Sequence, residues 1–487
     1  MIKQNNLLVN LSLSNISTTP FYVMPSGLLS LIAYLRENGV PSDLVDLNVV
    51  RRKNVGATDL KLVSIFEKQL IEDEPCLVGA SVMVAGQFGL ARDILKATKK
   101  HSPTIITVIG GAHVSQFSKE ILENCPEIDF VVIGEGEQQL LACSHFAQTK
   151  TPPASWPDGI AYRSGTKVVV NDKVSYIDNV DTLPFPAYDV LNFNDYLHDT
   201  STWHNPYQID MGVRTPIITS RGCPNLCNFC SVAKCMGRFY RPMSSSKVVD
   251  MMQKLHEHNN VSTFVIYDSN FAQETQRVVD ICNEITKRKL KFNLDLPTGL
   301  PINATAKEMI DALADAGLIR TCISIESGDF DIRNKAMKKN VELDDVFKVV
   351  EYIRHYPQIF ILADFILGMP EDTVESVDAS CRLIEEVDID DIELSIATPY
   401  PGTNLFQQCE QENLFFGSID KNSLWISDWY SHVNLDKFII KPYALDLKML
   451  QTYRIRILSM RAAKLSAYRK RMETFFNITS NYARERS

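Results

Sequence analysis

The sequence predicts an α/β protein: a doubly wound, Rossmann-like N-terminal domain, then a partial β/α barrel and a mostly helical C-terminal region. Short apolar runs alternate with helix-sized patterns through the first 150 residues, which is typical of a parallel sheet with crossover helices. A second, more regular alternation begins at Pro216, and after residue 403 the pattern becomes helical and aromatic. We therefore expect four segments, which are 1–150, 151–215, 216–403 and 404–487.

Length and composition indicate a large globular chain. At 487 residues, with 45% apolar and 22% charged residues, it can bury sizeable cores. The net charge of −9 argues against general nucleic-acid binding, and the basic stretch 454–471 is interpreted as a solvated helix face. No apolar run reaches the roughly 18 residues of a membrane helix, and no signal peptide is recognised. Eleven scattered cysteines do not indicate a disulfide framework, so we expect a cytoplasmic protein.

The N-terminal domain is expected to alternate strands and helices from its first apolar run. The expected strands are 7–13, 44–47, 76–83, 104–109 and 130–133, and the expected helices are 27–37, 59–72 and 88–99. In such sheets, ligands bind at the carboxyl ends of the strands. Two candidate turns occur there, Gly110-Gly111-Ala112-His113 and Gly134-Glu135-Gly136-Glu137.

The middle of the chain is expected to join the two domains. Residues 151–215 are rich in Pro, Asp, Asn and aromatic residues, so we interpret them as a linker or cap with an aromatic loop at 203–207. The barrel follows, and active groups of such barrels come from the carboxyl ends of the strands. The expected strands are 216–220, 263–268, 291–296, 321–325, 359–367 and 392–397, and the expected helices are 245–257, 273–289, 305–316, 343–355 and 373–386.

A cysteine cluster directly follows the first barrel strand. Cys223, Cys227 and Cys230 have the spacing C-x3-C-x2-C, so three thiolates on one short loop can converge on an iron–sulfur cube and leave its fourth iron open. An exogenous ligand can bind that open iron. A structural zinc site is the alternative, with Cys235 or a nearby histidine as the fourth ligand. The position at a barrel strand end favours catalysis.

This loop resembles the signature of the radical S-adenosylmethionine (SAM) superfamily. The resemblance implies that Cys223, Cys227 and Cys230 hold a [4Fe–4S] cluster whose open iron binds SAM. It also implies reductive cleavage of SAM to methionine and a 5′-deoxyadenosyl radical, which removes a hydrogen atom from the substrate. Phe229 is expected to shield the cluster or to stack on a ligand ring.

Other barrel strand ends resemble the same superfamily. Glu326, after the fourth strand, is implied to hydrogen-bond the methionyl amino group or the ribose of SAM, with Ser327 assisting, and a helix cap is the alternative. Gly368 and Pro370, after the fifth strand, suit packing against an adenine. Asp268, after the second strand, is a partial match because a serine replaces the second carboxylate that relatives often carry.

The order of a doubly wound domain, a linker and a cysteine-bearing barrel resembles the cobalamin-binding branch of this superfamily, up to about residue 410. The resemblance implies cobalamin as a further cofactor, which the N-terminal domain would lay against the barrel mouth. The Asp-x-His-x-x-Gly motif that supplies a cobalt ligand in some cobalamin proteins is absent. His113 is therefore expected to contact a cofactor side-chain amide or to cap a helix. The expected cofactor-binding residues are Gly110, Gly111, His113, Gly134 and Glu135.

We expect an enzyme that methylates an unactivated carbon. One SAM would methylate cob(I)alamin, and a second, at the cluster, would yield the radical that activates the substrate. One alternative is a radical cyclisation or rearrangement of the anaerobic magnesium-protoporphyrin cyclase type, and another is a non-catalytic scaffold with a vestigial cluster. The expected partners are a small-molecule, lipid or peptide substrate and an electron donor such as flavodoxin or ferredoxin. Trp425, Trp429, Tyr430 and Tyr443 are expected to close one side of the active site.

Overall fold

The computed structural model describes residues 5–13, 24–196, 212–417, 424–426 and 437–485, with side chains to residue 473. The predicted aromatic loop at 203–207, and also Trp429 and Tyr430, lie outside the described residues. The chain divides into two compact units. The N-terminal unit comprises Met1–Asp199, Val232–Gly237 and Ile419–Asn434, and the C-terminal unit comprises Thr200–Ser231, Arg238–Ser418 and Leu435–Ser487.

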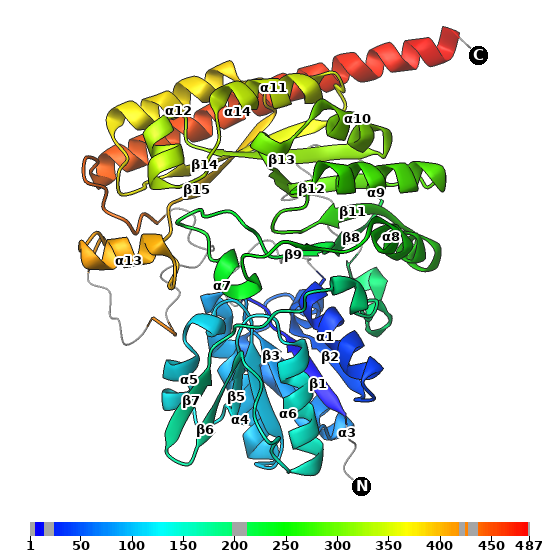
Figure 1. The fold of residues 1–487 in the computed structure, drawn as a ribbon, viewed down its shortest axis with the longest axis vertical. Helices are drawn as coiled ribbons and strands as arrows, with labels where there is room; N and C mark the ends of the chain where they lie inside the picture. Colours follow the sequence, from blue (N-terminus) through cyan, green and yellow to red (C-terminus); the bar gives the residue numbers. More distant parts are fainter. Residues whose placement is uncertain (1–4, 14–23, 197–211, 418–423, 427–436, 486–487) are drawn as a thin grey trace. The chain divides into compact units, whose positions relative to one another are not determined.

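A seven-stranded sheet forms the core of the N-terminal unit (Figure 1). Its strands are β1 (Asn6–Asn10), β2 (Ser42–Asp46), β3 (Leu77–Ser81), β4 (Ile106–Gly110), β5 (Phe130–Val132), β6 (Ile160–Ser164) and β7 (Lys167–Asn171), and its helices are α1 (Ser26–Glu37), α2 (Leu47–Lys53), α3 (Asp59–Asp73), α4 (Phe88–His101), α5 (Ser118–Asn124) and α6 (Glu137–Thr149). The strand order is β2-β1-β3-β4-β5-β6-β7, and β1 to β5 run parallel. The chain moves from β1 out to β2 and then back to β3, so right-handed crossovers place α1 and α3 on opposite faces. The doubly wound prediction is confirmed.

Two features of this unit differ from the sequence prediction. The segment interpreted as a linker contains β6 and β7, an antiparallel hairpin that pairs with β5 and extends the sheet. Its turn contains Gly165 at φ +61°, and its strands are only half-buried, so they lack the continuous apolar run by which the parallel strands are recognised. Helices α2, α5 and α6 were also not predicted. Asp46 caps α2, because its side chain accepts hydrogen bonds from the N–H groups of Asn48 and Val49.

The C-terminal unit contains an open six-stranded parallel sheet in the order β15-β14-β13-β12-β11-β8. These strands are β8 (Val213–Ile217), β11 (Val261–Ile266), β12 (Asn293–Leu300), β13 (Leu318–Glu326), β14 (Phe360–Leu367) and β15 (Asp391–Ile396). The connecting helices are α8 (Ser245–Asn259), α9 (Thr275–Lys287), α10 (Lys307–Asp315), α11 (Leu343–Arg354) and α12 (Val374–Glu386). All six predicted strands are present, and the sheet does not close on itself. The partial β/α barrel is therefore confirmed.

The C-terminal region is mostly helical, as predicted, with α13 (Asn404–Gln411) and the long α14 (Leu447–Glu485, red in Figure 1). The interpretation of the basic stretch as a solvated face holds for Arg456, Arg469 and Lys470, which are exposed, and is wrong for Arg461 and Lys464. Arg461 forms a bidentate pair with the buried Asp391 at 2.7 and 2.9 Å, and Lys464 donates to the carbonyl of Val387 at 2.7 Å. These contacts dock α14 along β15, so the helix covers one edge strand of the sheet.

Among the described residues, no helix is both long enough and apolar enough to cross a membrane.

Removal of the Arg461 pair should loosen β15. Arg461→Met leaves the buried Asp391 without its cation, which should cost about 1–2 kcal/mol of local stability. Amide hydrogen exchange of β15, followed by mass spectrometry of the whole chain, should become about five- to thirtyfold faster. Arg469→Met is the matched control, because Arg469 is exposed on the same helix, and it should leave the rate unchanged. Equal exchange rates in the two variants would show that the pair does not hold the helix.

Candidate functional site

The cysteine loop follows β8 and is fastened at its base to the next strand. The buried carboxylate of Asp268, just beyond β11, accepts hydrogen bonds from Thr219 N and Thr219 Oγ1, both at 2.6 Å. It also accepts one from Ser220 Oγ at 2.6 Å. Arg277 of α9 donates to the carbonyl and the hydroxyl of Thr219 at 2.8 and 2.9 Å. Both Asp268 oxygens are therefore used within the protein, in support of the loop that precedes Cys223.

Asp268 is fully buried, and this burial carries an electrostatic cost. Burial raises the pKa of its carboxyl group, and the hydrogen bonds from Ser220 and Thr219 act in the opposite direction. The sequence prediction named Asp268 as a cofactor-binding residue. Its side chain contacts Thr219 and Ser220 at the base of the loop, and cofactor binding by Asp268 stays a prediction.

The far half of the loop is fixed through Asn228. Its backbone N–H donates to the carbonyl of Met337 at 3.1 Å, and its carbonyl accepts from Leu405 N, at the start of α13, at 3.1 Å. Phe229 is half-buried and packs against the apolar cluster that contains Met337 and Leu405. Asn228 is only 7% exposed, and its Oδ1 has no hydrogen-bond partner among the described residues. A bound group with an N–H or O–H could donate the hydrogen bond that this buried oxygen lacks.

The three loop cysteines stand in different surroundings. Cys223 lies 4.0 Å from the side-chain amide of Asn270, and Cys230 is exposed. The pKa of the Cys227 thiol is raised to about 11, chiefly by burial. Lys339 acts in the opposite direction, and Cys230, Glu326 and Cys223 add to the increase. The three thiols are thus within electrostatic reach of one another. A metal must displace the proton from such a thiol, so binding would release protons.

Three thiols on one short loop are the donor set that a protein supplies to an iron–sulfur cube with one open iron. Across the described ranges, no three His, Cys, Asp or Glu side chains converge as the ligands of one metal do. A cube distributes its thiolates over separate irons, so they stand farther apart than the ligands of zinc. Cys235, the suggested fourth zinc ligand, is buried within the N-terminal unit.

Glu326 ends β13 in the left-handed region, at φ +71°, which is uncommon for a side chain of this size. Its Oε1 accepts from Lys339 Nζ at 2.7 Å, and both side chains are largely buried. Burial would lower the pKa of Lys339, but the charges of Glu326 and Cys227 outweigh it, so the pKa is raised. The sequence analysis missed Lys339, because no spacing motif links it to Glu326.

The remaining predicted barrel residues build turns at the same strand ends. Ser327 is buried, and its hydroxyl accepts from the N–H of Asp329 at 3.2 Å. Gly368 adopts φ +95°, and its N–H donates to Asp372 at 2.8 Å. The Pro370 carbonyl accepts from Tyr443 N at 2.9 Å, which places Tyr443 beside the turn after β14.

The inner face of the open sheet carries ionisable groups. Asp295 of β12 is fully buried and forms a bidentate pair with Arg320 of β13 at 2.7 and 2.6 Å. Asp364 of β14 accepts from Ser324 Oγ at 2.9 Å and is paired in register with Glu393. Burial, with a contribution from Glu326, raises the pKa of Asp364 to about 7. A closed barrel fills this space with apolar side chains, so a polar interior suits a hydrated or ligand-binding space.

The predicted glycine turns of the N-terminal unit lie at the carboxyl edge of its sheet and are closely packed. A Cβ atom at Gly111 would lie 2.4 Å from the carbonyl oxygen of Val82. One at Gly134 would lie 2.8 Å from the carbonyl oxygen of Cys235. Gly110 ends β4 beside Val132, and the Glu135 carboxylate accepts from the N–H of Ile177 at 3.3 Å. The glycines therefore serve close backbone packing at this edge.

His113 is 4% exposed, and its Nε2 lies 2.9 Å from the backbone carbonyl of Trp425. Phe88 packs edge-on against both rings. Burial lowers the pKa of His113 to about 4, so the imidazole is neutral at physiological pH. His113, which was expected near the cofactor, thus binds Trp425. Trp425 comes late in the sequence and belongs to the N-terminal unit.

The strand order indicates a second possible ligand site at the carboxyl edge of the N-terminal sheet. In the order β2-β1-β3-β4-β5, the chain reverses direction between β1 and β3, and ligands of such sheets bind at that reversal. Gln87 bridges the two strand ends, since its amide donates to the Leu11 carbonyl at 2.8 Å and accepts from Met83 N at 2.9 Å. Met83 is 54% exposed there, which is unusual for a large apolar side chain and was not predicted.

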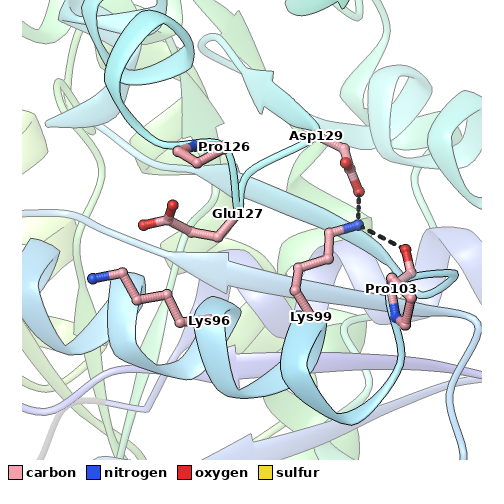
Figure 2. Close-up of a pocket in the computed structure, with 6 residues that line it drawn as sticks. All are labelled: Lys96, Lys99, Pro103, Pro126, Glu127 and Asp129. Atoms are coloured by element: carbon pink, nitrogen blue, oxygen red, sulfur yellow. Dashed lines mark hydrogen bonds and ion pairs between the residues drawn. The ribbon is translucent and has the colours of Figure 1, made fainter.

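A cavity of about 540 Å³ lies at the opposite edge of the same sheet (Figure 2). It is lined by Lys96, Lys99, Pro103, Pro126, Glu127 and Asp129. Lys99 pairs with Asp129 at 2.5 Å across it, and Pro103 and Asp129 precede β4 and β5. It is therefore remote from the carboxyl ends of the strands of its own sheet.

Two family models match the chain. The model described as B12 binding domain matches residues 14–144, and that described as Radical SAM superfamily matches residues 217–384. The second match contains the cysteine loop and Glu326, and the first contains the sheet edge with Met83 and His113.

Individual relatives are distant and extend over most of the chain. An uncharacterised methyltransferase of Pyrococcus horikoshii is 26% identical over 415 residues, which are 85% of this chain and 82% of that protein. The anaerobic magnesium-protoporphyrin IX monomethyl ester cyclase of Cereibacter sphaeroides is 27% identical over 387 residues, 78% of this chain and 58% of the cyclase.

A solved structure shares the fold. The radical SAM methyltransferase TsrM from Kitasatospora setae, with cobalamin and a [4Fe–4S] cluster bound, superimposes with a TM-score of 0.66 at 19% identity, over 84% of this chain and 78% of that one. The chain therefore combines an N-terminal B12-binding domain with a radical SAM domain, whose cysteine loop lies at the end of the first barrel strand.

Proposed function

We propose that the chain is a cobalamin-dependent radical SAM enzyme that methylates an unactivated carbon. The observation that carries this proposal is the pairing, in one chain, of a three-cysteine loop with a B12-binding domain. When bound, the cluster and SAM supply a carbon-centred radical, and cobalamin supplies a methyl carrier. The relative from Pyrococcus horikoshii is named a methyltransferase, and TsrM is one, so two proteins with this arrangement share the reaction class.

In the C-terminal unit, the proposal assigns cluster binding to Cys223, Cys227 and Cys230. Asp268 keeps the loop in place beneath them through Thr219 and Ser220. Lys339 and Glu326 lie within electrostatic reach of Cys227, so they offer one cationic and one anionic group. The amino acid part of SAM carries one carboxylate and one ammonium group. Lys339 would bind the carboxylate and Glu326 the ammonium group, which orients SAM at the cluster.

In the N-terminal unit, the proposal assigns cobalamin to the carboxyl edge of the sheet, near the reversal between β1 and β3. Met83 offers an exposed apolar side chain there, on a loop that Gln87 holds in place. His113 faces Trp425 and is neutral, and its Nε2 is already engaged. It therefore supports the binding edge without ligating cobalt. Gly110, Gly111, Gly134 and Glu135 shape that edge through backbone packing.

Substrate, electron donor and compartment follow from this chemistry. The polar inner face with Asp364 and Arg320 favours a substrate with hydrogen-bonding groups, which includes small molecules and peptides and disfavours a purely apolar lipid. Reductive cleavage of SAM needs one electron, so an external donor such as flavodoxin or ferredoxin is required. All eleven cysteines are free, which agrees with a reducing, cytoplasmic environment.

A radical cyclisation is the second candidate. The cyclase from Cereibacter sphaeroides is as similar to this chain as the methyltransferase from Pyrococcus horikoshii. The chain spans 58% of that cyclase, so much of the cyclase has no counterpart here. In the methylation, the methyl group of SAM is transferred to the corrinoid. In the cyclisation, no such transfer takes place.

Each loop cysteine should be required for iron. Cys223→Ala, Cys227→Ala and Cys230→Ala, purified anaerobically and reconstituted with iron and sulfide, should lose most of the iron that the wild-type protein retains. Cys235→Ala is the matched control, because Cys235 lies five residues beyond the loop and is buried, and it should retain iron. Iron and sulfide analysis per chain gives the answer. Wild-type iron content in all three variants would refute the cluster assignment.

The Lys339–Glu326 pair should govern affinity for SAM. The double variant Lys339→Met, Glu326→Gln removes both charges and leaves neither unpaired, and it should weaken SAM binding about ten- to hundredfold. Anaerobic calorimetric titration of the reconstituted protein measures this. The control is Lys335→Met, Asp331→Asn, which removes an exposed pair from the same segment. Unchanged affinity in the first variant would exclude the two residues from the SAM site.

Methyl transfer can be tested without the natural substrate. The holoenzyme, given a strong reductant and SAM with a deuterated methyl group, should move the label to the bound corrinoid. One S-adenosylhomocysteine should form for each corrinoid labelled, as measured by mass spectrometry of the extracted small molecules. Formation of 5′-deoxyadenosine with no label on the corrinoid would favour the cyclase reaction. If neither product forms, the chain is no radical SAM methyltransferase.

A further inference from the structure

The amide of Asn270 is a buried polar group beside the cluster loop that has no role in the preceding assignments. Asn270 follows β11, is 7% exposed, and its Nδ2 lies 4.0 Å from the sulfur of Cys223. The same nitrogen lies 2.5 Å from the carbonyl oxygen of the Gln273 side chain. An asparagine amide has two N–H groups, so one can point to Gln273 and the other to the sulfur.

The position of this amide is fixed by its neighbours on both sides. Two residues earlier, Asp268 binds Thr219 and Ser220, which ties this segment to the base of the cysteine loop. Three residues later, Gln273 holds the amide from the other side. The donor is therefore presented to Cys223 by the segment that follows β11.

The three thiols consequently differ in electrostatic environment. Cys223 has a neutral N–H donor, Cys227 has the buried cation Lys339, and Cys230 faces solvent. An N–H bond to a cluster thiolate stabilises the reduced cluster more than the oxidised one, because the reduced cluster carries one more negative charge. Such a bond raises the reduction potential.

We propose that Asn270 is a positioning residue that donates an N–H to the Cys223 thiolate and so raises the reduction potential of the cluster. This proposal rests on the proposed function, because it requires a cluster on Cys223. The step concerned is a one-electron reduction, in which an external donor supplies the electron and no bond is formed or broken. A higher potential makes the cluster easier for that donor to reduce.

The test is a potentiometric titration of the reconstituted full-length protein without SAM, followed by electron paramagnetic resonance of the reduced cluster. Asn270→Leu keeps the approximate volume and removes the donor, and Asn270→Asp keeps the shape and adds negative charge. Both should shift the midpoint to more negative values. Loss of the donor should reduce the ratio of reduced to oxidised cluster at a fixed potential about tenfold, which corresponds to about 59 mV for a one-electron couple.

Two further variants separate tuning from general damage. Asn225→Ala changes an exposed asparagine in the same loop and should titrate as the wild-type protein does. Gln273→Leu removes the second anchor of the amide and should shift the midpoint in the same direction as Asn270→Leu, by less.

The outcomes are distinguishable. A wild-type midpoint in either Asn270 variant with full iron content overturns the proposal. Loss of iron from both Asn270 variants also overturns it, since Asn270 would then hold the cluster and not tune it. A wild-type protein that assembles no cluster would instead remove the proposed function itself.

Discussion

The candidate site depends on one buried carboxylate. Asp268 joins the end of β11 to Thr219 and Ser220, at the base of the cysteine loop, and Arg277 closes the network from α9. A loop that carries three ligands at its tip needs such a support, because its own backbone makes few contacts near Pro224 and Leu226, which are exposed. Burial raises the pKa of Asp268, and its three hydrogen bonds from Ser220 and Thr219, together with the charge of Arg277, offset part of that cost.

Polar contacts also hold the other parts of the site, at the ends of further strands. Asn228 connects the far half of the loop to Met337 and Leu405, Lys339 neutralises Glu326, and Asn270 is held by Gln273 beside Cys223. Cys223 and Cys227 therefore meet different groups, an amide that follows β11 and a cation from the segment after β13, whereas Cys230 is exposed. Parallel strands make this possible, since their carboxyl ends gather side chains from distant parts of the sequence at one edge. The chemistry of the site is thus a consequence of the topology of the sheet.

The sequence predicted the features that local pattern determines. Both parallel sheets follow from buried apolar runs, and the cysteine loop follows from its spacing. The hairpin of β6 and β7 was missed because half-buried strands lack such runs. Lys339 was missed because its neighbours Lys338 and Asn340 adopt left-handed conformations that turn the chain back toward Glu326. The contact of His113 with Trp425 joins residues 312 positions apart. The hydrogen bonds of Asp268 with Thr219 and Ser220 likewise become evident only in the folded chain.

The central claim is that three protein thiolates leave one iron of a cube available to SAM. Mössbauer spectroscopy of protein reconstituted with ⁵⁷Fe, recorded before and after addition of SAM, tests it most directly. The account predicts four irons per chain, of which one changes its isomer shift when SAM is added while three keep theirs. Spectra that SAM leaves unchanged at all four irons, or protein that retains only a single mononuclear iron, would contradict it.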